Sequence, residues 1–234
     1  MVNSSTSCFK CVDRITTCIY CCGRLVKNGI SKAKKQRYKC KSCSKTIVDN
    51  YTYNAYFPHI NKEIVLLLTE GMGIRSIARI LQISATTLLK RIIAISATVS
   101  LPAIQPECRY EIDELCTFIK VKSKRIWIVY AFERETKNIV SFNVGARTNL
   151  TLKKVVDKVL KANPVAVFTD KLKNYISLIP RCIHKTVRFG TNNIERANLT
   201  LRTHLKRLNR KTICFSKSAV FLEAVLKIYF GSFA

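Results

Sequence analysis

Apolar side chains recur every three or four residues in the segment that follows Ile60, and this spacing predicts amphipathic helices. The groups are Ile64, Leu67 and Leu68, then Ile74, Ile77, Ala78 and Leu81, then Leu88, Leu89 and Ile92. Gly71 and Gly73 are expected to end the first helix, and Ser84 is suited to cap the third. A short turn between the last two helices predicts a helix-turn-helix, although a helical spacer would show the same pattern.

The pattern changes to strands beyond Pro106. Three β-rich runs follow, separated by VKSK and RETK, and predict antiparallel strands: RYEIDELCTFIK, RIWIVYAFE and NIVSFNVG. We then expect an amphipathic helix at 149–162, a buried strand in PVAVFTD, helical structure in KLKNYISLI, a brief strand near Cys182, and a basic helix across 191–218. The resulting order, βββαβαβα, is that of the ribonuclease-H-like fold, a mixed sheet flanked by helices.

Cysteine spacing predicts a metal site near the N-terminus. Two C-x2-C pairs are separated by 18 residues, a spacing typical of sites in which four thiolates hold Zn²⁺. The four residues are Cys18, Cys21, Cys40 and Cys43. Asn28-Gly29 is expected to turn a hairpin between the pairs. So small a unit buries little apolar area, so the metal would supply much of its folding free energy.

Two questions about the cysteines stay open at this point. Disulfides in an exported protein are the alternative to a zinc site. No role is assigned to Cys8, Cys11 and Cys22, which also lie in this cysteine-rich region.

These patterns together predict a multi-domain protein that combines α+β and α/β architecture. We expect a zinc ribbon at residues 1–50 and a helix-turn-helix at 51–98. A proline-containing linker at 99–108 then leads to a ribonuclease-H-like domain at 109–234. The length of 234 residues suits one medium domain with smaller ones beside it.

The charge of the chain points to nucleic acid as its partner. It has 41 Lys and Arg against 14 Asp and Glu, a formal net charge of +27 at pH 7. Such an excess attracts DNA, because each neutralised phosphate releases condensed counterions. A membrane is the other anionic partner, but no apolar run reaches the roughly 18 residues of a spanning helix, and the first residues lack a signal-peptide core. We expect a cytoplasmic, nucleoid-associated protein with no membrane partner.

The third helix of the predicted helix-turn-helix is expected to enter the major groove of double-stranded DNA. Its polar residues would then contact the DNA. These residues are Thr86, Thr87, Lys90 and Arg91.

Acidic residues are scarce, so each one in the predicted sheet needs a reason. Asp113 lies inside the first strand and Asp170 ends the strand of PVAVFTD, although strand interiors disfavour Asp. The first and fourth strands are neighbours in the expected sheet, so these two carboxylates can converge. Alternation along the strand places Glu114 on the opposite face, and we expect it to point away from the site.

Glu195 is the single acid of the basic segment 191–218, and its helix would lie across the same edge of the sheet. Three carboxylates on elements that fold together suit Mg²⁺ or Mn²⁺. Two such ions, roughly 3.5–4 Å apart, stabilise the attacking and leaving oxygens of an in-line phosphoryl displacement. The alternative for Glu195 is a carboxylate that only complements the positive end of the helix dipole.

The chain resembles transposases of the insertion-sequence IS-one (IS1) family. The most specific matching segment is NNIERANLTLRTHLKRLNRKTICFSKS, and shorter matches run nearly end to end, among them CIYC, QRYKCKSC, IDEL, KSKRIWIVYAF and FTDKLKNY. The family is one of DDE-type recombinases. The resemblance therefore implies cleavage of element ends by water, joining of the 3′ hydroxyl to target DNA, and Asp113, Asp170 and Glu195 as the catalytic acids. It also implies that the ribbon and the helix-turn-helix recognise terminal inverted repeats.

Five residues of the matching basic segment are candidates for DNA contact: Arg196, Asn198, Arg202, Lys206 and Arg210. Three of them, Asn198, Arg202 and Lys206, would share the Glu195 face at helical spacing. Because two element ends must be paired, a homodimer or larger homo-oligomer is expected. Both halves of the enzyme lie in one chain, so we expect it to be translated directly.

Two other functions share parts of this pattern. A catalytically inactive DNA-binding regulator would use only the ribbon and the helix-turn-helix. A ribonuclease-H-like nuclease or resolvase would share the three acids and cleave DNA without strand transfer.

Overall fold

The computed structural model describes residues 17–49, 53–57, 59–209 and 211–232. The chain forms two compact units, Met1–Tyr56 and Phe57–Ala234. Among the described residues no single helix is long and apolar enough to cross a membrane, and two helices reach that length and composition only as a pair bent by 105°.

The first unit contains a three-stranded antiparallel sheet. Its elements are β1 (Leu25–Ile30), β2 (Gln36–Cys40), β3 (Thr46–Val48) and the short 3-10 helix η1 (Asn54–Tyr56). The turn expected at Asn28-Gly29 is wrong, because β1 continues through both residues. Gly29 has a φ of +72° and absorbs an irregularity in the register with β2. The chain reverses instead after β1, where the Lys35 amide donates to the Ser31 hydroxyl oxygen (3.0 Å).

Three helices open the second unit where the apolar spacing predicts them. They are α1 (Ile60–Thr69), α2 (Ile74–Ile80) and α3 (Ala85–Thr98), and α2 and α3 meet at the bend of 105°. The predicted cap of α3 is present, since the Thr87 amide donates to the Ser84 hydroxyl oxygen (3.0 Å). Ile64, Ile77 and Leu88 are fully buried, so the apolar stripes form the core of this segment.

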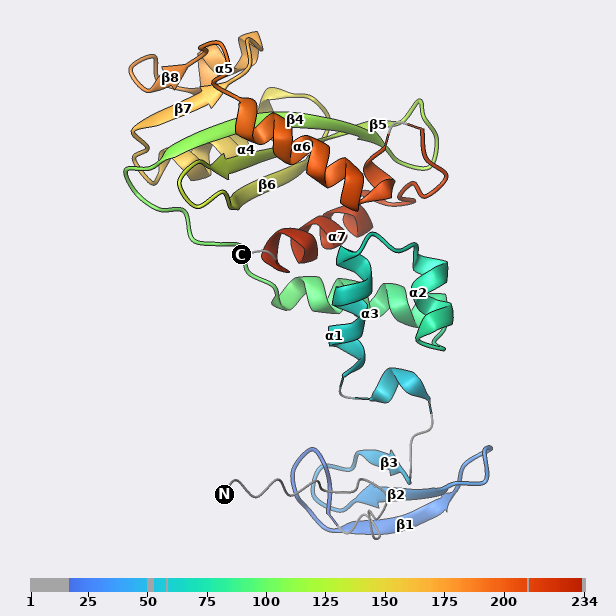
Figure 1. The fold of residues 1–234 in the computed structure, drawn as a ribbon. Helices are drawn as coiled ribbons and strands as arrows, with labels where there is room; N and C mark the ends of the chain where they lie inside the picture. The colour runs from blue at the N-terminus through green and yellow to red at the C-terminus, as the bar shows by residue number, and fades with distance from the viewer. Residues whose placement is uncertain (1–16, 50–52, 58, 210, 233–234) are drawn as a thin grey trace, which may run out of the picture. The chain divides into compact units, whose positions relative to one another are not determined.

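A five-stranded mixed sheet follows, in the order β6-β5-β4-β7-β8 (Figure 1). The strands are β4 (Arg109–Phe118), β5 (Arg125–Glu133), β6 (Ile139–Gly145), β7 (Ala166–Thr169) and β8 (His184–Lys185). Strands β4, β5 and β6 are antiparallel, whereas β7 runs parallel to β4 and β8 parallel to β7. This topology agrees with the ribonuclease-H-like plan expected from the sequence. Because β7 pairs with β4 only as far as Ile112, it leaves the edge of β4 open from Asp113 onward.

Helices cover both faces of this sheet, with α4 behind it and α6 in front of it in Figure 1. The helices are α4 (Asn149–Leu160), α5 (Lys173–Leu178), α6 (Asn192–His204) and α7 (Ala219–Ser232). The apolar face of α4, with Leu152 and Val155, packs in one cluster with Ile112 of β4 and Tyr175 of α5. The side chains directly before and after Ile112 lie on the opposite face of β4 and therefore point toward α6.

The basic segment forms a shorter helix than expected. α6 ends at His204 and is followed by the 3-10 turn η2 (Lys206–Leu208). Arg202 donates from Nη1 to the Leu208 carbonyl oxygen (2.7 Å), so a side chain of the helix stabilises the turn that follows it. Lys206 thus lies outside α6 and does not share the helical face of Glu195.

The sequence pattern assigned no element to residues 219–232, which form α7. This helix is apolar on almost all sides, with Leu222, Val225 and Ile228 among its fully buried residues. A helix that is apolar on most sides shows no single apolar stripe, so helical spacing does not reveal it.

Candidate active site

Three carboxylates meet at the open edge of β4. Asp113 and Glu114 lie on β4 and Asp170 follows β7, and one oxygen of each lies within 4.8 Å of the others. The parallel register pairs Ile112 with Thr169, so the next residue of each strand, Asp113 and Asp170, reaches the same edge. The structure therefore brings Asp113 and Asp170 together. A group of hard oxygen ligands of this kind suits Mg²⁺ or Mn²⁺.

Glu114 belongs to this group, and the expectation that it points away is wrong. Its carboxylate accepts hydrogen bonds from the Tyr175 hydroxyl of α5 (2.6 Å) and from Arg147 (3.2 Å). Burial raises the pKa of Glu114, and the two hydrogen bonds act in the opposite direction. Asp113 and Glu114 start on opposite faces of β4, as strand alternation predicts. Because β7 ends beside Ile112, both carboxylates can still reach the free edge of β4.

Asp113 is connected to α6 through Asn198. The Asn198 side-chain amide donates to Asp113 Oδ2 (2.6 Å), and the buried Tyr130 hydroxyl donates to Asn198 Oδ1 (2.8 Å). Burial raises the pKa of Asp113 to about 6, and the charges of Glu114 and Asp170 act in the same direction. The hydrogen bonds from the Glu114 backbone and from Asn198 lower the pKa and so offset part of this effect. A divalent cation would relieve the repulsion among these acids.

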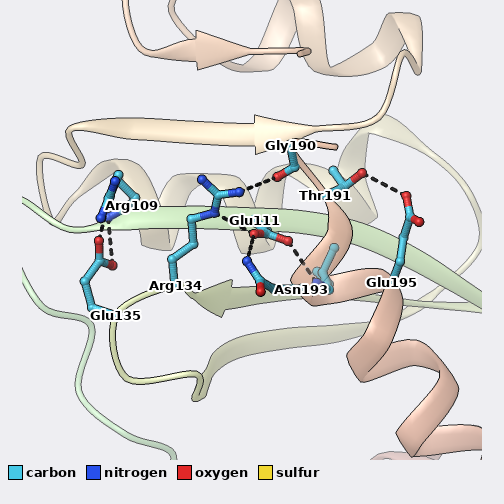
Figure 2. A network of polar contacts seen from close by, with 9 residues as sticks. Arg109, Glu111, Arg134, Glu135, Gly190, Thr191, Asn193 and Glu195 are labelled. Atoms are coloured by element: carbon cyan, nitrogen blue, oxygen red, sulfur yellow. Dashed lines mark hydrogen bonds and ion pairs between the residues drawn. The ribbon is translucent and has the colours of Figure 1, made fainter. Parts of the chain in front are cut away.

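Glu195 lies on the neighbouring helix but outside the carboxylate group. Its exposed side chain is turned toward Thr191, whose hydroxyl donates to Glu195 Oε1 (2.9 Å) (Figure 2). A surface cavity of about 300 Å³ connects Glu195 with the open edge of β4. It is lined by Glu114, Leu115, Cys116, Trp127, Glu195, Asn198 and Arg202. The structure thus places Glu195 beside the site and leaves its carboxylate bonded to Thr191.

The expected DNA-contacting residues differ in their surroundings. Thr86, Lys90, Arg196 and Lys206 are exposed, whereas Thr87, Arg91, Asn198 and Arg202 are half-buried. Arg202 lines the cavity while its Nη2 donates to the Cys116 carbonyl oxygen (3.2 Å). Arg210, together with Cys8 and Cys11, lies outside the described residues.

Sequence reasoning missed one further acid of β4, Glu111. It is fully buried, forms an ion pair with Arg134 (2.6 Å) and accepts a hydrogen bond from the Ile194 amide of α6 (2.8 Å). The sequence does contain a pattern that points to Glu111: it lies two residues before Asp113, so strand alternation places both acids on the same face of β4.

The four predicted cysteine ligands converge in the first unit. Sulfur atoms of Cys18, Cys21, Cys40 and Cys43 all lie within 4.8 Å of one another, and all four are free thiols. The Cys43 amide donates to Cys40 Sγ (3.5 Å), and this hydrogen bond is the largest of several that together lower the pKa of Cys40 to about 6. A thiolate is the form that ligates a metal, so the arrangement fits a four-thiolate zinc site. Cys22 follows Cys21 directly but is exposed and lies outside the group.

Two solved structures resemble part of the fold. One is the HTLV-2 integrase catalytic core domain in complex with magnesium, with a TM-score of 0.38 and 11% identity, covering 55% of this chain and 86% of that chain. The other is the simian T-cell lymphotropic virus intasome in complex with PP2A regulatory subunit B56 gamma, with a TM-score of 0.36 and 15% identity, covering 70% of this chain and 66% of that chain.

Sequence comparison gives a more specific result. Residues 108–232 match the family model described as IS1 transposase. The insertion element iso-IS1n protein InsB of Shigella dysenteriae is 36% identical over 116 residues, which are 50% of this chain and 88% of that protein. The insertion element IS1 4 protein InsB of Escherichia coli strain K12 is 35% identical over 119 residues, 51% of this chain and 71% of that protein. The chain therefore belongs to the IS1 transposase family.

Proposed function

We propose that the protein is a DDE transposase that binds the terminal inverted repeats of its insertion sequence and catalyses DNA strand cleavage and strand transfer. Membership of the IS1 transposase family supports the general class. The observation that carries the proposal is the meeting of the Asp113 and Asp170 carboxylates at the open edge of β4, beside the helix that bears Glu195. The net charge of +27 suits a protein that holds two DNA segments.

Asp113 and Asp170 would bind the divalent cations, Mg²⁺ or Mn²⁺, and Glu195 would complete the ligand set after leaving Thr191. Bound in pairs, such ions activate an attacking oxygen and stabilise a leaving oxygen in phosphoryl transfer. Asn198 holds one oxygen of Asp113 and so orients this carboxylate. Arg202, fixed by two backbone carbonyl oxygens, would place a positive charge near the DNA phosphate in the cavity.

The N-terminal part would recognise the element ends. The four cysteines would hold a structural Zn²⁺, and α3 would enter the major groove with the exposed Thr86 and Lys90. Cleavage and joining involve two element ends and a target duplex, so we propose that the active form is a homodimer or a larger homo-oligomer.

The proposal is tested by cleavage and joining assays on inverted-repeat DNA with Mg²⁺. Asp113→Ala, Asp170→Ala and Glu195→Ala should each lower the cleavage rate by at least about 100-fold, because each would remove a ligand of the reacting centre. Their affinity for inverted-repeat DNA should change by less than about threefold, since the proposed recognition elements are untouched. Asp157→Ala is the matched control, because Asp157 is an exposed acid of α4.

Other outcomes would contradict parts of the proposal. Specific binding without cleavage by the wild type, with either Mg²⁺ or Mn²⁺, would identify a DNA-binding regulator. Cleavage without joining would identify a nuclease or resolvase. Wild-type cleavage by Glu195→Ala would remove Glu195 from the ligand set and leave Glu114 as the third carboxylate of the site.

A further inference from the structure

Glu111 is a fully buried carboxylate that the proposed chemistry does not use. Its Oε1 accepts hydrogen bonds from Arg134 Nε (2.6 Å) and Asn193 Nδ2 (2.7 Å) (Figure 2). Its Oε2 accepts a hydrogen bond from the Ile194 amide (2.8 Å). Removing a carboxylate from water is costly unless it is paired and hydrogen-bonded, so these contacts account for its burial. Two of the three partners belong to the first turn of α6.

These hydrogen bonds take the place of an N-cap on α6. Thr191 is the N-cap residue, but its side chain makes no capping hydrogen bond and donates to Glu195 instead. The first amides of a helix have no acceptor within the helix, and a carboxylate placed there also meets the positive end of the helix dipole. Ile194 is the third residue of α6, and in many helices the amide at this position donates to the side chain of the N-cap residue. Here Glu111 accepts this hydrogen bond instead.

Arg134 joins Glu111 to the segment that leads into α6. Its Nη2 donates to the Gly190 carbonyl oxygen (3.0 Å), and its guanidinium lies 4.0 Å from the centre of the Phe168 ring of β7. Gly190 is closely packed, because a Cβ added there would meet the Val187 carbonyl oxygen at 2.9 Å. Glu111 of β4, Arg134 directly after β5 and Phe168 of β7 thus together fix the position at which α6 begins.

We infer that Glu111 and Arg134 are positioning residues, which hold the first turn of α6 so that Glu195 is presented to the open edge of β4. Glu195 follows Ile194 directly, so the hydrogen bond to the Ile194 amide sets the place of the turn that carries Glu195. Asn198 lies one turn further and reaches Asp113. The inference rests on the proposed role of Glu195.

The test uses the double variant Glu111→Met/Arg134→Met. Replacing a buried ion pair by apolar side chains of similar length leaves no lone buried charge, and such replacements are often tolerated. The matched control is Arg109→Met/Glu135→Met. Arg109 and Glu135 form a second arginine–carboxylate pair of the same sheet (2.8 Å), which is partly exposed and stands apart from the contacts to α6 in Figure 2.

Two readouts separate positioning from a merely structural role. Per folded molecule, the double variant should lower kcat for cleavage of inverted-repeat DNA by about 30-fold while KM for DNA stays within about threefold. Amide hydrogen exchange of residues 193–196 should become at least about tenfold faster, since the helix start has lost its acceptor. The control should leave kcat and exchange within about twofold of the wild type.

Wild-type kcat in the folded double variant would overturn the inference, and so would a loss of kcat with unchanged exchange at residues 193–196. If the double variant does not fold, Glu111→Gln replaces it. This variant keeps one acceptor oxygen and the side-chain length, so it should lower kcat about three- to tenfold; unchanged kcat and exchange there would also overturn the inference. If the wild type cleaves no DNA, the proposed function fails, and the exchange of residues 193–196 alone decides whether the pair holds α6.

Discussion

The carboxylate of Asp113 is held where its charge is unfavourable. Its pKa rises from 3.8 to about 6 through burial and through the charges of Glu114 and Asp170. The unfolded chain lacks this environment, so above pH 6 the ionised Asp113 lowers the free energy of unfolding. Well below pH 3.8 the carboxyl is protonated in both states and the cost disappears. The contribution of this group therefore makes the cation-free protein more stable as the pH falls from about 6 to 4.

We expect Asp113→Asn to raise the free energy of unfolding of the unit Phe57–Ala234 by about 1–2 kcal/mol at pH 8 without added Mg²⁺. The amide carries no charge, and its oxygen can still accept the hydrogen bond from Asn198. The gain should shrink at pH 4.5, where the wild-type carboxyl is largely protonated. Urea unfolding at both pH values measures the effect.

The control for this measurement is Asp157→Asn, which changes an exposed acid of α4 and should stay within about 0.5 kcal/mol of the wild type at both pH values. A free energy of unfolding for Asp113→Asn equal to or below that of the wild type at pH 8 would show that Asp113 carries no such cost.

At the scale of the elements, the N-terminal sheet has a small core among the residues that the structure describes. Its buried cluster contains Cys18, Cys40 and Ile47, with Leu25 and Cys43 packed against it. Burial of so few apolar groups does not offset the conformational entropy of ordering three strands and their turns. Three of these five residues, Cys18, Cys40 and Cys43, are proposed metal ligands, so metal binding and folding of this sheet would be one event.

We expect Cys40→Ser to abolish zinc binding, because it removes a buried ligand whose sulfur is already polarised by the Cys43 amide. The wild type should carry about one Zn²⁺ per chain, measured by native mass spectrometry. Specific binding to inverted-repeat DNA should be lost along with the metal, as measured by fluorescence anisotropy.

Cys22→Ser is the matched control, since Cys22 belongs to the same turn as Cys21 but is exposed and outside the ligand group. It should keep the metal and the DNA affinity of the wild type. Full zinc content in Cys40→Ser, or unchanged specific binding after verified zinc loss, would refute the ribbon as the zinc-dependent recognition element.

At the scale of the whole molecule, Phe57–Ala234 forms one unit because the helices α1–α3 pack against elements of the C-terminal part. α7 contacts α1 and α3 as well as β6 of the sheet. The turn after α1 also approaches the end of α6 closely, since a Cβ added at Gly71 would collide with the His204 carbonyl oxygen. The turn between α1 and α2 therefore touches the end of the helix that bears Glu195.

We expect Gly71→Ala to lower the melting temperature of the second unit by several degrees, since a unit of this size loses roughly 2–4 °C for each kcal/mol of stability lost. Two causes add: Gly71 has a φ of +74°, and the new methyl group would collide with the His204 backbone. Differential scanning calorimetry measures the change.

Gly29→Ala is the control that separates the two causes. Gly29 has a similar φ of +72°, but a Cβ there meets nothing within 4 Å. It should leave the melting of the second unit unchanged and cost the first unit only the backbone strain, about 1 kcal/mol. Equal melting of Gly71→Ala and the wild type would mean that the turn after α1 does not pack on α6.

Local sequence patterns account for most elements of the chain, because the spacing of apolar residues is a property of each segment alone. Helices α1–α4, the long strands β4–β6 and the Ser84 cap lie where that spacing predicts them. The sequence also accounts for the convergence of Asp113 and Asp170, which follows once the first and fourth strands of the sheet are parallel neighbours. The four-cysteine group followed in the same way from two short, regularly spaced pairs.

The features that depend on where an element ends and on which elements it contacts became visible only in the folded chain. Glu114 joins the site because β7 ends beside Ile112, and no local pattern states how long a partner strand runs. Glu111 is buried because the first turn of α6 lies against it, and its carboxylate accepts the Ile194 amide while the Thr191 hydroxyl donates to Glu195. The sequence pattern missed helix α7 for the same reason, since its neighbours bury most of its side chains and leave only a narrow polar face to set its period.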